Sequence, residues 1–174
     1  MIWLQAFDSG GGNGVSYQKL DYTRVVAWLR AILAVDPRSG YPLFAAARVY
    51  AENADPAKAR LICDFIFEEF AADPNRRWPA LAQAALLAKH RLQDLALARR
   101  YAAAIGRLAT DESIPLWARQ MEIFILEDMD ELEAAKVMLG GLLATGRIRD
   151  PGERRFLQQR LDQLEARLKT ANPR

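Results

Sequence analysis

The chain has 174 residues, which is enough for one domain with a hydrophobic core. Hydrophobic residues make up 51% of it, which excludes a disordered protein, and the net charge of +2 is too small to indicate nucleic-acid binding. Alanine supplies much of the apolar share, and no stretch alternates apolar and polar residues as a half-buried strand does. The composition therefore predicts an all-α protein.

The first element is an apolar segment, Met1-Ile2-Trp3-Leu4-Gln5-Ala6-Phe7, followed by a glycine-rich stretch at 9–14. The segment is too short to span a membrane, and it lacks the basic start of a signal peptide. Two interpretations stay open. It is either the trailing end of a membrane tether that begins upstream of Met1, or a strap that packs Trp3 and Phe7 onto the domain. Residues 1–16 are therefore predicted to be an apolar segment and a flexible linker.

A repeat follows this linker. The stretch that begins at Asp36 returns at Asp73, a shift of about 37 residues, and a third copy around Ile114-Pro115 follows about 36 residues later. Each copy places a bulky residue before a proline, and proline is favoured at the first position of a helix. Second helices are expected to begin at Asp55-Pro56, Asp94 and Asp130. The pattern predicts eight helices, at 18–35, 41–53, 55–72, 78–90, 93–109, 115–127, 130–145 and 151–170.

The last helix differs from the others in its charge. Residues 147–174 carry eight basic and four acidic side chains, whereas residues 1–146 carry sixteen and eighteen. A helix that is charged on most of its surface is typical of the end of a repeat array. We therefore predict helical repeats over 17–146, as a half repeat plus three pairs, and a capping helix over 147–174.

Residues at equivalent places in these pairs resemble the tetratricopeptide repeat (TPR). That family has a small residue and then an aromatic in the first helix, an alanine in the second helix, and a closing proline. The first unit matches with Ala47, Tyr50, Ala59 and Pro74. The second matches with Ala84, Leu87 and Ala98 but lacks the aromatic, and in the third Gln120 replaces the small residue while Ile123 and Ala135 fit. The repeats are degenerate, and the Lys and Asn clamp of the chaperone-binding members is absent.

The resemblance implies a right-handed α-solenoid of stacked antiparallel helix pairs. It also implies a concave groove, lined by the first helix of each pair, that binds a peptide or helix of a partner protein. Carried onto this chain, the groove positions are Tyr41, Phe44, Arg48, Trp78, Leu81, Lys89, Trp117, Met121 and Phe124. Arg76 and Arg77, beside Trp78, form a candidate secondary basic contact. The alternative is that the aromatic rings are core residues between the stacked pairs.

The sequence offers little to a catalytic or metal-binding hypothesis. The only histidine, His90, lies among basic residues at a predicted helix C-terminus, where the helix dipole favours cations. The only cysteine, Cys63, is expected to be buried. The acidic run 127–131 lacks the alternating ligands of a calcium loop. The glycines at 10–14 lack the Lys-Ser/Thr of a phosphate loop.

We therefore expect a non-enzymatic scaffold that binds another protein, with no cofactor, metal or nucleic acid. The alternative is a structural subunit of a membrane-tethered or self-associating assembly.

Overall fold

The structure is a computed structural model, and it describes residues 16–171 except 147 and 149. The predicted apolar segment and most of its linker lie outside the described residues. Nine α-helices and two 3₁₀ turns, and no strand, are found in the part that is described, so the predicted all-α class is confirmed. Within that part, no helix is both long enough and apolar enough to cross a membrane.

The elements follow one another with short connections. They are η1 (Tyr17–Lys19), α2 (Tyr22–Val35), α3 (Tyr41–Arg48), η2 (Tyr50–Glu52), α4 (Pro56–Phe70), α5 (Pro74–His90), α6 (Leu95–Leu108), α7 (Leu116–Arg119), α8 (Met121–Asp128), α9 (Leu132–Ala144) and α10 (Pro151–Ala171).

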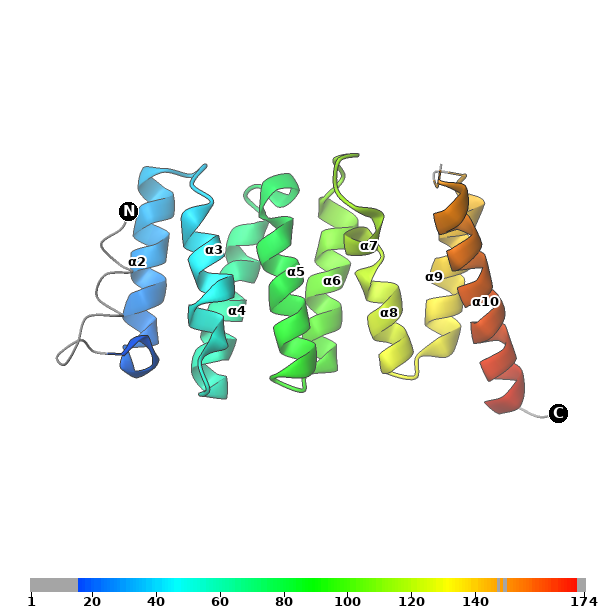
Figure 1. Cartoon of the computed structure of the whole chain (residues 1–174). Helices are drawn as coiled ribbons and strands as arrows, with labels where there is room; N and C mark the ends of the chain where they lie inside the picture. Colours follow the sequence, from blue (N-terminus) through cyan, green and yellow to red (C-terminus); the bar gives the residue numbers. More distant parts are fainter. Residues whose placement is uncertain (1–15, 147, 149, 172–174) are drawn as a thin grey trace.

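The helices stand side by side in a row that runs from α2 at one end to α10 at the other (Figure 1). The helices α3, α5, α8 and α10 lie nearer the viewer, and α4, α6 and α9 lie behind them. Each helix packs against its neighbours in chain order, and α3 also contacts α5, as α2 contacts α4. The helices thus form two layers, and α3, α5, α7 and α8 belong to the layer nearer the viewer in Figure 1.

Capping residues fix several helix starts where the sequence predicts them. The Asp55 carboxylate accepts a hydrogen bond from the backbone nitrogen of Ala57 at 2.9 Å, and Pro56 occupies the first turn. The Asp94 carboxylate likewise accepts from the nitrogen of Leu97 at 2.8 Å. Each carboxylate satisfies a backbone donor that has no partner within the helix, which is why aspartate is favoured there.

Four predicted helices differ from the structure by more than two residues or by a break. The helix expected at 18–35 begins at Tyr22, after the separate 3₁₀ turn η1. The helix expected at 78–90 begins at Pro74, so Pro79 lies inside α5. The helix expected at 41–53 ends at Arg48 and continues as the 3₁₀ turn η2. The helix expected at 115–127 is divided at Gln120 into α7 and α8, which is why nine helices replace the predicted eight.

The core forms two clusters that meet at α8. The larger one extends from α2 to α8, and the smaller one joins α8, α9 and α10 through Ile123, Leu126, Leu139, Leu157 and Leu164. The alanines that match the small positions of the family pattern are buried, as shown by the exposure of Ala47 (3%), Ala59 (1%), Ala84 (0%), Ala98 (0%) and Ala135 (0%).

Hydrogen bonds between side chains tie successive helices together. The hydroxyl of Tyr101 on α6 donates to the Asp64 carboxylate on α4 at 2.9 Å. The buried Asn53 amide donates to the hydroxyl of Tyr22 at 2.9 Å, and that hydroxyl donates to the carbonyl of Tyr50. These bonds pair polar groups that would be costly to bury alone, and they join α4 to α6 and α2 to the segment at η2.

Candidate functional site

A cleft of about 280 Å³ separates α3 from α5, and we call it the α3–α5 cleft. Three segments line it: the loop 37–40, one face of α3 and one face of α5. The α3 residues are Leu43, Phe44, Ala47 and Arg48, and the α5 side consists of Asp73, Arg76, Arg77, Pro79, Ala80 and Gln83.

The base of the cleft is apolar and its rim is aromatic and charged. Leu43 and Ala47 are buried, with 4% and 3% exposure, so they form the base. The ring of Phe44 projects at the rim with 61% exposure. An aromatic ring left in water beside an apolar depression is the kind of feature that protein interaction sites use.

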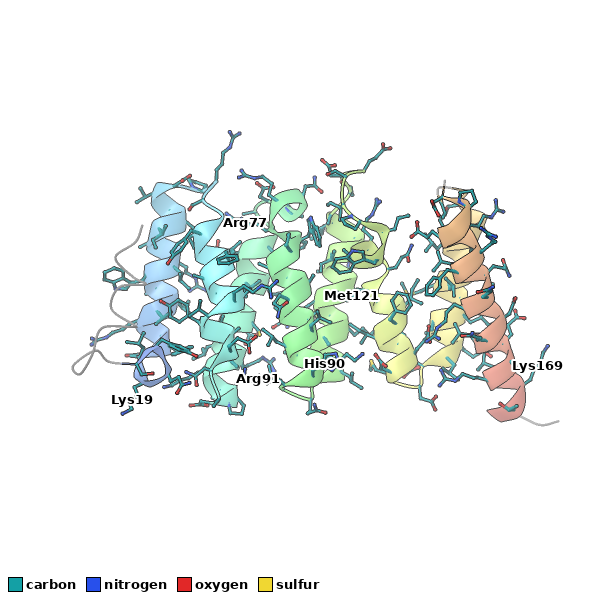
Figure 2. All side chains as sticks on the ribbon, viewed as in Figure 1. Lys19, Arg77, His90, Arg91, Met121 and Lys169 are labelled. Atoms are coloured by element: carbon teal, nitrogen blue, oxygen red, sulfur yellow. The ribbon has the colours of Figure 1, made fainter. Side chains whose placement is uncertain are left out.

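Arg77 holds the loop-side end of the cleft in place. Its side chain is buried between α3 and α5 (Figure 2) and donates to the Pro37 carbonyl at 2.9 Å and to the Glu69 carbonyl. It also forms an ion pair with the Glu69 carboxylate at 3.3 Å. The prediction of a basic contact at Arg77 is therefore wrong, because this side chain is buried and its guanidinium binds Pro37 and Glu69 within the protein.

Arg76 is exposed and partly engaged. Its guanidinium donates to the Arg38 carbonyl at 2.9 Å and lies 3.8 Å from the Asp73 carboxylate. These two contacts place Arg76 at the same end of the cleft as Arg38.

Two other arginines of the cleft are free. Among the described residues, the guanidinium groups of Arg38 and Arg48 have no hydrogen-bond or ion-pair partner, and both side chains are exposed. Arg48 lies one turn beyond Phe44 on α3, and Arg38 precedes α3. With Asp73 close to Arg76, the cleft keeps an excess of positive charge.

A pair of tryptophans bridges the next two helices of the same layer. The rings of Trp78 on α5 and Trp117 on α7 meet edge to face, with centroids 5.6 Å apart. Trp78 is half-buried, whereas Trp117 is 51% exposed. Two of the rings predicted for the groove, Trp78 and Trp117, therefore contact each other, and Trp117 keeps half of its surface exposed.

Other residues predicted for the groove lie elsewhere. Leu81 is fully buried and Met121 is 7% exposed, and both belong to the larger core cluster, so their assignment to an open surface is wrong. Phe124 is half-buried on α8. Lys89 is half-buried and forms an ion pair with Asp128 on α8, so it joins two helices.

Tyr41 lines a separate hollow. It is half-buried, and it borders an apolar depression of about 360 Å³ between α2 and α3 at the first end of the row. Trp28, which is 70% exposed, forms the most open part of this depression. The predicted groove is therefore three separate features: this apolar hollow, the α3–α5 cleft, and the Trp78–Trp117 pair.

Sequence reasoning missed Arg38, Pro79 and Gln83 of the cleft and Trp28 of the hollow. The bulky-residue-Pro pattern predicts a helix start at Pro79, and no sequence pattern assigns Arg38, Gln83 or Trp28 to a surface. A signal did exist for Arg38, since the stretches at Asp36 and Asp73 are copies and put Arg38 and Arg76 close to equivalent positions.

The cysteine, the histidine and the acidic run considered in the sequence analysis lie outside the cleft. Burial raises the pKa of the Cys63 thiol to about 12, and His90 is exposed at the end of α5 (Figure 2). In the acidic run, Glu127 pairs with Arg160 and Asp130 with Arg167. No cluster of three or more His, Cys, Asp or Glu among the described residues is placed to hold a metal ion.

Comparisons of the chain with protein-family models, with curated proteins and with solved structures give no match.

Proposed function

We propose that the chain is a non-enzymatic scaffold of tetratricopeptide-like helix pairs, wound as a right-handed α-solenoid, that binds a peptide or helix of a partner protein. The binding surface is the layer of α3, α5 and α7, from the α3–α5 cleft to the Trp78–Trp117 pair. The proposal includes no cofactor, metal or nucleic acid.

One observation carries the proposal. Phe44 and Trp117 are 61% and 51% exposed, on helices of the same layer, and an apolar-based cleft lies beside Phe44. Large exposed aromatic side chains beside a depression, with arginines at its rim, are the features that supply most of the binding energy at protein interfaces. The buried alanines in the helix pairs support the repeat architecture that would align such residues.

A peptide selection tests this function. A random peptide library displayed on phage is selected against the immobilised chain, and enriched peptides are synthesised and titrated by calorimetry. We expect Phe44→Ala and Trp117→Ala each to weaken binding about tenfold or more, because each removes an exposed anchor.

The matched control is Val137→Ala on α9, in the other layer, where the side chain is 70% exposed. This variant should bind like the wild type. An absence of enriched peptides, or equal losses in all three variants, would overturn the proposal.

The apolar hollow between α2 and α3 favours a second candidate, a structural subunit of a self-associating or membrane-tethered assembly. An open apolar depression at the end of a row could receive the end of another copy. Sedimentation analysis of the wild type and of Trp28→Asp tests self-association. A mass that rises with protein concentration only in the wild type would support it, and a monomer at every concentration would exclude it.

A further inference from the structure

The two free arginines lie at opposite ends of the α3–α5 cleft. Arg38 stands in the loop before α3, next to Arg76, and Arg48 is the last residue of α3. Arg38 and Arg48 are ten positions apart in the sequence, and α3 supplies eight of the residues up to Arg48. Their backbones are therefore on the order of 12–15 Å apart. Between them lie the apolar base of the cleft and the exposed ring of Phe44.

The charge at these ends is unbalanced. Arg77 is committed to Glu69 and to two carbonyls, and Arg76 shares Asp73. No other carboxylate borders the cleft among the residues described. A ligand that supplied carboxylates would thus meet the guanidinium groups of Arg38 and Arg48, which have no partner among the described residues to give up. Such charge-assisted bonds are stronger than neutral ones.

From this arrangement we infer that the partner segment is acidic, with an apolar side chain between two carboxylates. The apolar side chain packs against Phe44 and over Ala47 and Ala80. One carboxylate binds Arg48, and the other binds Arg38 and Arg76. In an extended segment, residues about four positions apart span the separation of the two ends. The inference rests on the proposed function and specifies its ligand.

A peptide fits the cleft better than a nucleic acid does. The chain has a net charge of only +2, whereas nucleic-acid sites concentrate many cations along a backbone track. The apolar base also offers contact to an aliphatic side chain and no polar group for a base edge, since Leu43 and Ala47 form it.

Three fluorescein-labelled synthetic peptides serve as the probes. All have a central leucine, and the residues two positions before and after it are aspartate in the first peptide, asparagine in the second and lysine in the third. Fluorescence anisotropy should show the aspartate peptide binding about tenfold more tightly than the asparagine peptide, and the lysine peptide binding weakest. The advantage of the aspartate peptide should fall as salt is added, because the arginines are exposed.

Charge reversal separates recognition from a loss of folding. Arg48→Glu should weaken the aspartate peptide about tenfold and strengthen the lysine peptide above its wild-type affinity, which a merely unfolded variant would not do. The matched control is Arg107→Glu, at an exposed position on α6 in the layer behind. It changes the net charge equally and should leave all three affinities unchanged, and circular dichroism verifies that both variants fold.

The outcomes distinguish this inference from the function on which it rests. Suppose that selected peptides depend on Phe44 and Trp117, but that they lack acidic residues and tolerate Arg48→Glu. The scaffold function then stands and the acidic ligand is wrong. If neither the selection nor the aspartate peptide gives binding, both proposals fail. Binding of a single-stranded oligonucleotide that is lost in Arg48→Glu would also overturn the acidic-peptide ligand.

Discussion

Leu81 and Leu86 show how differently two leucines of one helix can be placed. Both lie on α5, yet Leu81 is fully buried and Leu86 is 40% exposed. The family resemblance predicts Leu81 for the groove because it stands at a position that lines the groove in that family. In this helix, alanines lie on several sides, so apolar content alone does not tell the buried face from the open one.

Leu81→Ala should lower the free energy of unfolding by about 2–5 kcal/mol, because it removes buried methyl groups and leaves a cavity. Leu86→Ala on the same helix is the control and should cost less than about 1 kcal/mol. Urea denaturation followed by circular dichroism measures both. Similar values for the two variants would contradict the burial of Leu81.

The burial of Cys63 should also affect how the stability of the protein depends on pH. Burial raises its pKa from an ordinary value of 9.0 to about 12, with the Asp64 charge acting in the same direction. Between these two values the unfolded state has lost its proton while the native state has kept it. The free energy of unfolding should therefore fall as pH rises from about 9 toward 12. Burial also raises the pKa of Tyr101, which adds to the same trend.

A thiol reagent should accordingly react with Cys63 slowly in the native protein near pH 8 and at once in strong urea. Prompt reaction of the native protein would contradict the burial.

At the scale of elements, the sequence predicts which segments are helical and misplaces some ends. Asp55-Pro56 and Asp94 lead directly to helix starts because their carboxylates cap the backbone. The sequence offers two possible starts for α5, Asp73-Pro74 and Trp78-Pro79. The helix begins at the earlier one, Asp73-Pro74. The break between α7 and α8 lies at Gln120, where the sequence has neither Gly nor Pro. No local sequence signal therefore predicts this break.

Pro79 should cost α5 stability, because in a helix interior it cannot donate the hydrogen bond to the carbonyl four residues earlier. We expect Pro79→Ala to raise the free energy of unfolding by about 1–3 kcal/mol. In the control, Pro74→Ala, the proline lies in the first turn, where no hydrogen bond is lost. This variant should lower the same quantity by up to about 1 kcal/mol through the unfolded state. Thermal denaturation distinguishes the two, and a loss of stability in Pro79→Ala would show that its ring packs in the cleft.

The attachment of α10 gives a second prediction at this scale. Arg160 pairs with Glu127, whose side chain is only 4% exposed, whereas Arg167 pairs with Asp130, whose side chain is 83% exposed. Arg160→Ala leaves a buried carboxylate without its cation and should cost about 3 kcal/mol. Arg167→Ala should cost less than about 1 kcal/mol. Equal costs, measured in urea, would mean that Glu127 finds another partner.

At the scale of the whole molecule, the two core clusters predict unequal stability along the row. The smaller cluster attaches α9 and α10 to α8, while the larger one joins the helices from α2 to α8. We expect backbone amides of α9 and α10 to exchange hydrogen faster than those of α4, α5 and α6. Native-state hydrogen exchange followed by mass spectrometry measures this, and equal protection throughout would contradict two separable units.

The sequence predicts the helical class and the order of the helices well, because Pro and Asp starts are local signals. Exposure depends on the rotation of each helix against its neighbours, and local signals do not specify that rotation. For this reason residues predicted for one surface differ in exposure: Phe44 and Trp117 are exposed, whereas Leu81 and Met121 are buried. Only the packed structure shows that Arg77 pairs with Glu69 and Arg76 with Asp73, while Arg38 and Arg48 have no partner among the described residues.

The arrangement of helices in a row has a consequence for how the chain folds. The long-range hydrogen bonds that hold it, such as those from Lys58 to Gln18 and from Arg77 to Pro37, join residues 40 apart in a chain of 174. Each bond therefore closes a short loop, and the entropy lost in closing a loop grows with its length. Each of these loops covers less than a quarter of the chain. In the repeat array that we propose, a folding nucleus can therefore form at any adjacent pair of helices and then extend to its neighbours.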